Sequence, residues 1–242
     1  MRLSIDHIPF ICNSTATLEA SFRQLGFRCS HRGEYTSPEF PKVAWQTTCV
    51  FLAQGWFDLL EAIEAPDLGT PSGCLFLANN LSAVLDGMNQ IRPNSQYSLE
   101  RRWFDSAEMG EHFELASFRE KICRLPVSVI QHQSPCSDID RSWLQHPNTA
   151  IRLEGLFCSS SKTEKTSELN QLLDTTQAIN LAPDEFEQRF GANSPNVAVQ
   201  VRVETRHRLT THLDTESIPH VQNETRVLAY PPSLDCVFEF NT

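Results

Sequence analysis

The feature of this 242-residue sequence that most limits its fold is a beginning that occurs three times. Each beginning combines a short apolar strand, two or three polar residues able to cap a helix, and apolar residues at helical spacing. The first covers residues 5–27, the second starts at Gly73, and the third starts at Leu153 and continues to Leu169, Leu172 and Leu173. Such internal similarity predicts repeated strand–helix units.

Segments typical of strands follow the first two helices. After the first helix they cover residues 27–35, 43–52 and 56–63, with Gln54-Gly55 as a tight hairpin turn. After the second they lie around residues 103–104, 113–118 and 125–131. Two units of one strand, one helix and three strands therefore fill residues 1–135, with modules at about 1–70 and 71–135.

The remainder of the chain is less regular. Polar, turn-forming residues predict a linker over residues 136–150. Residues 151–242 are expected to form a divergent third unit of βαβ type, with strands at 197–203 and 236–240. The polar stretch 206–223 has no clear assignment, and we expect His207 and His212 on a surface loop. The expected fold class is α+β.

Charge and hydropathy exclude several classes of partner. Twenty basic against thirty acidic residues give a net charge of −10, which would repel a phosphate backbone, so no nucleic acid partner is expected. The longest apolar runs, residues 50–53 and 74–78, are far shorter than the roughly 20 residues of a membrane span. The first seven residues lack the apolar core of a signal peptide. We expect a cytoplasmic monomer or homodimer without a membrane partner.

Eight cysteines occur without any C-x-x-C pair, and several lie inside apolar runs. This pattern indicates buried thiols in a reducing compartment. The sequence also lacks G-x-G-x-x-G, a Walker loop, H-E-x-x-H and G-x-S-x-G. No nucleotide cofactor is therefore expected.

Three short motifs in order carry a family resemblance: Asp6-His7-Ile8, Leu25-Gly26-Phe27 and the stretch WFDLLE at residues 56–61. The sequence resembles the vicinal oxygen chelate superfamily, and more closely its glyoxalase-like subgroup. Residues 125–132 and 146–148 resemble the second half of that subgroup, so the likeness covers about the first 150 residues. It implies paired βαβββ modules whose curved mixed sheet surrounds a cavity, with the divergent third unit packed beside them.

The resemblance also implies a divalent metal ion in the cavity, held by the first and fourth strands of each module. Carried over to this sequence, the ligands of the first module are His7 and Asp58. The equivalent positions of the second module are Gly73, which has no ligating side chain, and Gln131, which offers only a neutral amide. Either His132 or His146 would have to join the two ligands of the first module to complete a set of two histidines and one carboxylate.

Adjacent candidates compete because neighbouring strand residues face opposite sides of a sheet. Glu61 points away from the face of Asp58 in a regular strand, and becomes the better ligand if the register differs by one residue. Gln131 and His132 present the same alternative. Asp58 and Glu61 are the candidate catalytic carboxylates, since either could accept a proton.

Two further residues are candidate substrate contacts. Trp45 would narrow the cavity and favour a flat or small ligand, although such a tryptophan is more often part of a core. His146 precedes Pro147 in a predicted loop, where a histidine is usually structural, and its candidacy depends on the family likeness.

Two functions of different classes follow. The first is a metal-assisted lyase or isomerase acting on a small oxygen-rich molecule, in which the metal would stabilise charge on a carbonyl or enediolate oxygen. The alternative is a metal-free protein that binds or sequesters a small molecule, as the antibiotic-resistance branch of the superfamily does. The residues at positions 73 and 131 favour the alternative. A vestigial cavity on an interaction scaffold is a third, weaker possibility.

Overall fold

The computed structural model describes residues 3–35, 45–61, 65, 67–91, 97–104, 111–122, 125–133, 139–161 and 177–242. The predicted helix with Leu169, Leu172 and Leu173 lies outside these residues. None of the helices within them has the length and apolar character of a membrane span.

The first module begins with β1 (Ser4–Cys12) and α1 (Thr15–Gln24) and continues with β2 (Gly33–Tyr35), β3 (Trp45–Phe51) and β4 (Trp56–Glu61). β4 pairs in parallel with β1 and antiparallel with β3. Gly55 has a φ of +79° in the turn between β3 and β4, a conformation that glycine adopts without strain. The strand predicted over residues 27–35 is much shorter than expected, because only β2 pairs with β3.

The second module repeats this connectivity after the short strand β5 (Thr70–Pro71). It consists of β6 (Cys74–Leu77), α2 (Leu81–Ile91), β7 (Tyr97–Phe104), β8 (Glu111–Ile122) and β9 (Leu125–His132). β6 pairs in parallel with β9, as β1 does with β4, and antiparallel pairing of β1 with β6 joins the modules. The main strand order is β2-β3-β4-β1-β6-β9-β8-β7, which confirms the α+β class and the paired βαβββ modules.

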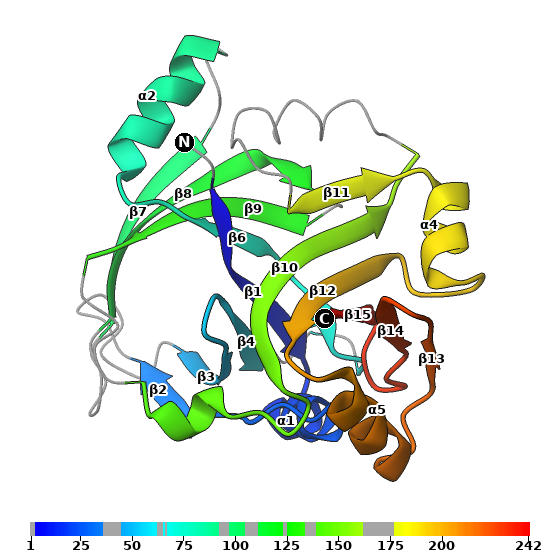
Figure 1. Cartoon of the computed structure of the whole chain (residues 1–242). Coiled ribbons are helices and arrows are strands. Elements are labelled where there is room, and N and C mark those ends of the chain that lie inside the picture. The colour runs from blue at the N-terminus through cyan, green and yellow to red at the C-terminus, as the bar shows by residue number, and fades with distance from the viewer. Residues whose placement is uncertain are drawn as a thin grey trace.

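The rest of the chain forms a second sheet after the 3-10 helix η1 (Arg141–Leu144) (Figure 1). Its elements are β10 (Ala150–Ser159), β11 (Ala178–Leu181), α4 (Pro183–Phe190), β12 (Val197–Val203), α5 (Arg206–Thr215), β13 (His220–Gln222), β14 (Arg226–Ala229) and β15 (Val237–Asn241). The strand order is β11-β10-β12-β15-β14-β13, with β12 parallel to β15. The segment β12–β15 therefore has the connectivity of the first module, so this part of the chain contains more than the single βαβ-type unit expected.

Helix α5 corrects the expectation that His207 and His212 lie on a surface loop. Its buried side consists of Leu209, Thr210 and Leu213 only, so the sequence shows little helical periodicity. Packing onto the second sheet stabilises this helix more than its intrinsic propensity does.

A cluster of phenylalanine rings joins the two sheets. Phe22 of α1 lies 5.1 Å from Phe10, 5.2 Å from Phe57 and 5.8 Å from Phe238 between ring centroids. Phe10 and Phe57 belong to the first sheet, whereas Phe238 is on β15 of the second. All four rings are fully buried. The sheets consequently share one core, at the place where α1 lies beneath both of them in Figure 1.

The described part of the predicted linker is tightly packed. His146, Asn148 and Thr149 are buried. The Asn148 side-chain amide donates to the Leu25 carbonyl oxygen at 2.8 Å, and its backbone N–H donates to the Gly26 carbonyl oxygen at 3.1 Å. A β-carbon on Gly26, whose φ is +84°, would lie 2.8 Å from that of Asn148. Glycine after α1 is therefore needed both for its backbone conformation and for this close approach.

The cysteines follow the sequence expectation only in part. Cys12, Cys29, Cys49, Cys74 and Cys236 are free and buried. Cys158 is disulfide-bonded, so the expectation of free thiols is wrong for this residue.

The shared core predicts that the two sheets unfold together. Replacing Phe238 by Ala removes the ring that contacts Phe10, Phe22 and Phe57, so we expect a loss of about 3–5 kcal/mol in the free energy of unfolding. Urea unfolding followed by both fluorescence and circular dichroism measures this. Val221→Ala, at a side chain 61% exposed, serves as the control and should change little. Two separate transitions in the wild type would contradict the shared core.

Candidate functional site

A cavity of about 220 Å³ lies on the face of the first sheet where the two modules meet. Most of its wall is apolar and comes from both modules, including Leu60, Leu75, Phe113, Leu115 and Ile130. His7, Asp58 and His132 also line it. Three of the four predicted metal ligands are thus at the same cavity.

A β-bulge in β1 directs two consecutive side chains toward this region. Ile5 pairs with Phe76 and His7 pairs with Leu75, so Asp6 is an extra residue in β1. A bulge shifts the alternation of side chains along a strand. Core residues accordingly lie at odd positions before the bulge, at Leu3 just ahead of β1 and at Ile5, and at even positions after it, at 8, 10 and 12.

Asp6 joins histidines of the two modules. His7 Nδ1 lies 2.7 Å from Asp6 Oδ2, and Nε2 of His132 lies 3.3 Å from the same oxygen. The carboxyl group is only 3% exposed. Burial raises the pKa of Asp6, but the hydrogen bonds with His132 and His7 outweigh it and hold the pKa below its ordinary value. The carboxylate is therefore charged and accepts hydrogen bonds from both imidazoles.

Aromatic rings complete this corner of the cavity. The His7 ring stacks on the Trp56 ring with centroids 4.5 Å apart and an interplanar angle of 18°. The His132 ring lies 5.6 Å from Trp56. Because Nδ1 of His7 donates to Asp6, its Nε2 is the nitrogen that can accept a further hydrogen bond.

Asp58 is a buried acid in the same wall. The Thr47 hydroxyl donates to its Oδ1, and the Cys49 thiol lies 3.7 Å from the same oxygen. Burial raises the pKa of Asp58, and the nearby His7, together with the contacts from Thr47 and Cys49, offsets this only in part. The environment therefore favours the neutral acid more than water does, and a neutral carboxyl group can both donate and accept a hydrogen bond.

Glu61 and Gln131 perform another role, which corrects their assignment to the site. The Thr15 N–H and hydroxyl both donate to Glu61 Oε2 at 3.1 Å, at the first turn of α1. The Leu81 N–H donates to Gln131 Oε1 at 2.7 Å, at the first turn of α2. Neither residue lines the cavity. Each therefore satisfies a backbone donor that a helix start leaves unpaired.

This shared role aligns the modules and identifies the counterpart of Asp58. Asp58 lies three residues before Glu61, and Ser128 lies three residues before Gln131; both Asp58 and Ser128 line the cavity. Gly73, the expected counterpart of His7, lines it as well. The second module thus presents a glycine and a serine where the first presents an imidazole and a carboxyl group.

The side-chain donors that the structure describes around the cavity do not fit a metal ion. Within the described residues, no three histidine, cysteine, aspartate or glutamate side chains are placed to bind one ion together. His7 and His132 each direct a ring nitrogen at Asp6, while Asp58 accepts from Thr47. Metal sites normally need about three protein ligands around one point.

His146, one of the two predicted substrate contacts, does not line the cavity. His146 accepts from the Arg28 N–H at Nδ1 and donates from Nε2 to the Phe51 carbonyl oxygen, at 2.9 and 2.8 Å. Burial lowers the pKa of His146, so this histidine is a neutral structural contact. The Trp45 side chain lies outside the described part of the structure.

Asp6 is the residue of this site that sequence reasoning missed. The available signal was a spacing of three between the apolar residues Ile5 and Ile8, in a strand that otherwise alternates every second residue. That break marks the bulge and places Asp6 beside His7.

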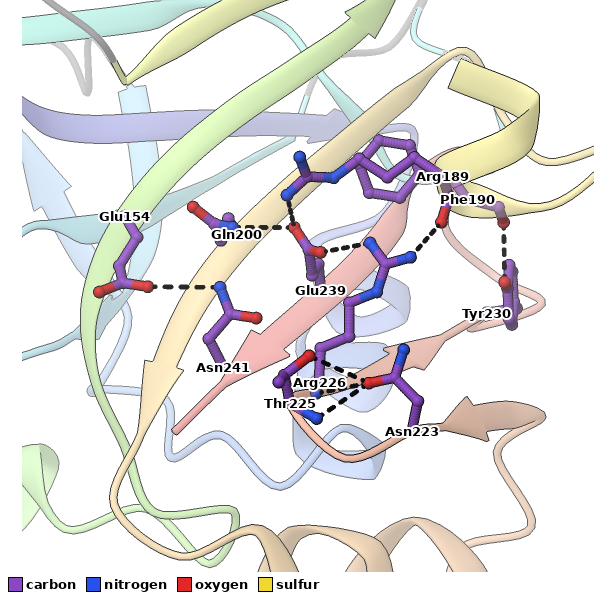
Figure 2. Close-up of polar contacts among 10 residues, drawn as sticks. All are labelled: Glu154, Arg189, Phe190, Gln200, Asn223, Thr225, Arg226, Tyr230, Glu239 and Asn241. Atoms are coloured by element: carbon purple, nitrogen blue, oxygen red, sulfur yellow. Dashed lines mark hydrogen bonds and ion pairs between the residues drawn. The ribbon is translucent and has the colours of Figure 1, made fainter. Parts of the chain in front are cut away.

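The second sheet has a charged network centred on β15 (Figure 2). Glu239 of β15, 1% exposed, accepts hydrogen bonds from Arg189, Arg226 and Gln200 at 2.7–2.9 Å. Arg189 comes from α4 and also lies over the Phe157 ring at 4.1 Å. Sequence reasoning did not identify this network, because its members are distant in the chain. Because three donors pair with the buried Glu239 carboxylate, we interpret this network as structural.

Comparisons with solved structures match nearly the whole chain at low sequence identity. 2,2',3-Trihydroxybiphenyl 1,2-dioxygenase from Sphingomonas wittichii strain RW1 matches with a TM-score of 0.59 at 9% identity, covering 100% of this chain and 90% of that one. A mutant of 4-hydroxymandelate synthase from Streptomyces coelicolor gives 0.62 at 9%, covering 99% and 92%. A variant of homoprotocatechuate 2,3-dioxygenase from B. fuscum gives 0.65 at 10%, covering 100% and 71%. No family model and no curated protein matches the sequence.

The raised pKa of Asp58 predicts a gain in stability on Asp58→Asn. A carboxyl group with a raised pKa stabilises the folded state below the unfolded pKa of about 3.8, and this stability is lost as pH rises through the folded pKa. The amide stays neutral and can still accept from Thr47. We expect a higher midpoint of urea unfolding than in wild type at pH 7, with the difference shrinking toward pH 4. If the variant were less stable than wild type at pH 7, the surroundings of Asp58 would not raise its pKa as described.

The network of Glu239 predicts a large loss of stability on Glu239→Gln. This change leaves two arginines without their buried counter-charge, so we expect a cost of about 3–5 kcal/mol. Glu154→Gln is the matched control, because Glu154 pairs with the more exposed Arg152 and should cost at most about 1 kcal/mol. Chemical unfolding measures the free energy of unfolding of both variants. Equal losses would show that Glu239 stabilises the fold no more than an exposed ion pair does.

Proposed function

Since the chain has the fold of the vicinal oxygen chelate superfamily, we propose that its first sheet binds a small, uncharged, hydroxylated aromatic molecule without a metal ion. The observation that carries this proposal is the pairing of a stacked His7–Trp56 wall with the buried acid Asp58 in one apolar cavity.

The shape and wall of the cavity support an aromatic ligand of one ring. Its volume of about 220 Å³ is below the roughly 300–1,000 Å³ usual for drug-sized ligands. The rings of Trp56 and Phe113 and the side chain of Leu75 offer apolar contacts on several sides. A flat ring buries well against such surfaces.

The polar groups of the cavity support hydroxyl groups and a neutral ligand. A neutral Asp58 carboxyl group can donate a hydrogen bond to one ligand oxygen and accept one from a ligand hydroxyl group. His7 Nε2 can accept a hydrogen bond from another ligand hydroxyl group. None of the described lining residues is a lysine or an arginine. A ligand carboxylate or phosphate would therefore find no permanent positive charge there.

The names of similar structures agree with the hydroxylated aromatic character of this ligand, but not with its single ring or its lack of charge, because a biphenyl has two rings and hydroxymandelate carries a carboxylate. The dioxygenase from Sphingomonas wittichii is named for a trihydroxylated biphenyl, and the Streptomyces coelicolor enzyme for a hydroxylated product. The sequence hypothesis of a metal-assisted lyase or isomerase has less support from the donor arrangement. Asp6 occupies one nitrogen of His7 and one of His132, and Ser128 stands at the counterpart of Asp58.

Calorimetric titration with catechol tests the proposal. Catechol is a neutral ring with two neighbouring hydroxyl groups, and we expect saturable binding that is unchanged in EDTA. Asp58→Ala should weaken binding about tenfold, the equivalent of one strong hydrogen bond. His7→Ala should weaken it several-fold by removing part of the ring wall.

Asp86→Ala is the matched control, because Asp86 is an exposed residue of α2 outside the cavity lining, and it should bind like wild type. Binding that appears only with added Mn²⁺, Fe²⁺ or Zn²⁺, or turnover of catechol under those conditions, would favour the metal-assisted enzyme instead. Equal binding by wild type and Asp58→Ala would reject the cavity as the site.

A further inference from the structure

The cavity of the first sheet contains an imidazole whose orientation is fixed by a residue outside the lining. Asp6 does not line the cavity, but its Oδ2 lies 2.7 Å from Nδ1 of His7, which does. A buried carboxylate bound to one imidazole nitrogen sets the tautomer and leaves the other nitrogen as a proton acceptor. Among the described residues, Nε2 of His7 has no hydrogen-bond partner. His7 is thus placed as a general base as well as a ligand contact.

Asp58 lines the same cavity from the neighbouring strand. It pairs with Pro9, two residues after His7 in β1, so His7 and Asp58 are diagonal neighbours on one face of the sheet. The usual spacing and rise of strands put their Cα atoms roughly 8 Å apart. Thr47 and Cys49 both contact Oδ1 of Asp58. Because Oδ1 accepts from Thr47, the proton of a neutral carboxyl group belongs on Oδ2, which can donate a hydrogen bond.

The serine hydroxyl groups of the cavity wall have partners other than His7. The Ser72 hydroxyl donates to the Pro9 carbonyl oxygen at 3.2 Å, and the Ser128 hydroxyl lies 3.0 Å from that of Ser117. This is not the arrangement of a serine nucleophile with its base, in which the two side chains are hydrogen-bonded. We therefore expect the imidazole to act on the ligand itself.

A base and a donor at two places along one ring suit a proton shift between carbon atoms. During such a shift a ketone oxygen of the ring gains negative charge, and a hydrogen-bond donor already aimed at it lowers the barrier. The wall around it is mostly apolar, and none of the described lining residues is a lysine or an arginine. The dienol form of an unsaturated ring ketone is a flat ring with a hydroxyl group, which is close to the ligand class proposed above.

We propose that this cavity catalyses an allylic proton shift in a neutral six-membered ring ketone, without a metal ion. His7 Nε2 removes a proton from the carbon between the carbonyl group and an isolated C=C bond. The electron pair moves toward the carbonyl oxygen, which accepts a hydrogen bond from Asp58 in the resulting dienolate. The same Nε2 then returns the proton to the far carbon of the former C=C bond. The double bond becomes conjugated with the carbonyl group, and no oxidant or reductant is consumed.

Two further residues hold the base in place. Asp6 is a positioning residue for His7, and His132 of the second module holds Asp6 in turn, with Nε2 at 3.3 Å from Oδ2. Catalysis here rests on the proposed function, because the ketone has to bind in the same metal-free cavity.

Conversion of 3-cyclohexen-1-one to 2-cyclohexen-1-one tests this inference, because the conjugated product absorbs ultraviolet light more strongly than the substrate. With the full chain in EDTA we expect saturable turnover, faster than with free imidazole at the same concentration, and competitive inhibition by catechol. Turnover no faster than with imidazole, although catechol binds, would overturn the proton shift and leave the proposed binding function intact. Absence of catechol binding would reject the proposed function, and the proton shift with it.

Variants of the base and of its positioning residue give different signatures. His7→Gln should lower kcat about 10²–10⁴-fold, the usual contribution of a general base. Asp6→Asn should lower kcat about 10²-fold or more but change KM and the catechol Kd little, because an amide that donates to Nδ1 moves the imidazole proton to Nε2. His207→Gln, at an exposed histidine of α5 outside the cavity lining, is the matched control. Thermal unfolding checks the fold, and wild-type kcat in a folded His7→Gln variant would overturn the proposal.

Two substitutions of Asp58 distinguish a hydrogen-bond donor from a base. An amide still donates to the carbonyl oxygen, so Asp58→Asn should keep more activity than Asp58→Ala, for which we expect a loss in kcat of about 10²–10³-fold. Neither replacement can accept a proton. Equal and complete losses in both variants would therefore make Asp58 the base and overturn the role of His7. Asp86→Asn, at an exposed aspartate of α2, is the control and should turn over like wild type.

Discussion

A carboxylate buried where two modules join must be paired, and the site around Asp6 follows from that requirement. A charged group inside a protein is costly unless hydrogen bonds compensate it. Histidines of β1 and β9 provide those bonds, one from each module. The bulge in β1 makes the arrangement possible, because a regular strand would place Asp6 and His7 on opposite faces. The same shift returns Ile8 and Phe10 to the core, so one extra residue serves both the site and the packing.

The sequence predicted the connectivity of the first 135 residues because strand and helix periodicities there are strong and occur twice. It was less informative where tertiary contacts decide the outcome. Helix α5 has only a narrow buried side, so its pattern did not indicate a helix. Among the candidate site residues, His7, Asp58 and His132 line one cavity, whereas Glu61 and Gln131 pair with helix starts. Which of two neighbouring residues faces a cavity depends on register, and a single bulge or capping contact changes it.

The two sheets show how one connectivity can support different interiors. In the first, β7–β9 continue the sheet beyond β6 and leave a cavity at the join of the modules. In the second, α4 follows β11 and sends Arg189 to Glu239, while Phe186 and Phe190 pack on the same face. Ionisable side chains on the two faces therefore have different neighbours: Asp58 meets hydroxyl and thiol groups, and Glu239 meets two guanidinium groups. Similarity of fold alone does not transfer chemistry from one face to the other.

The hydrogen bonds of Asn148 and His146 affect how such a chain can diversify. Both residues tie the approach to β10 onto the end of α1 and onto Arg28 and Phe51, and the backbone of Gln54 bonds to that of β10. A cut between the sheets would therefore break backbone pairing as well as the shared aromatic core. We therefore expect that the first sheet, which contains the cavity, would not fold if recombination moved it into another protein without the second sheet. A change in ligand preference is then expected to come from substitutions in the cavity wall, while the second sheet is kept because the first sheet packs against it.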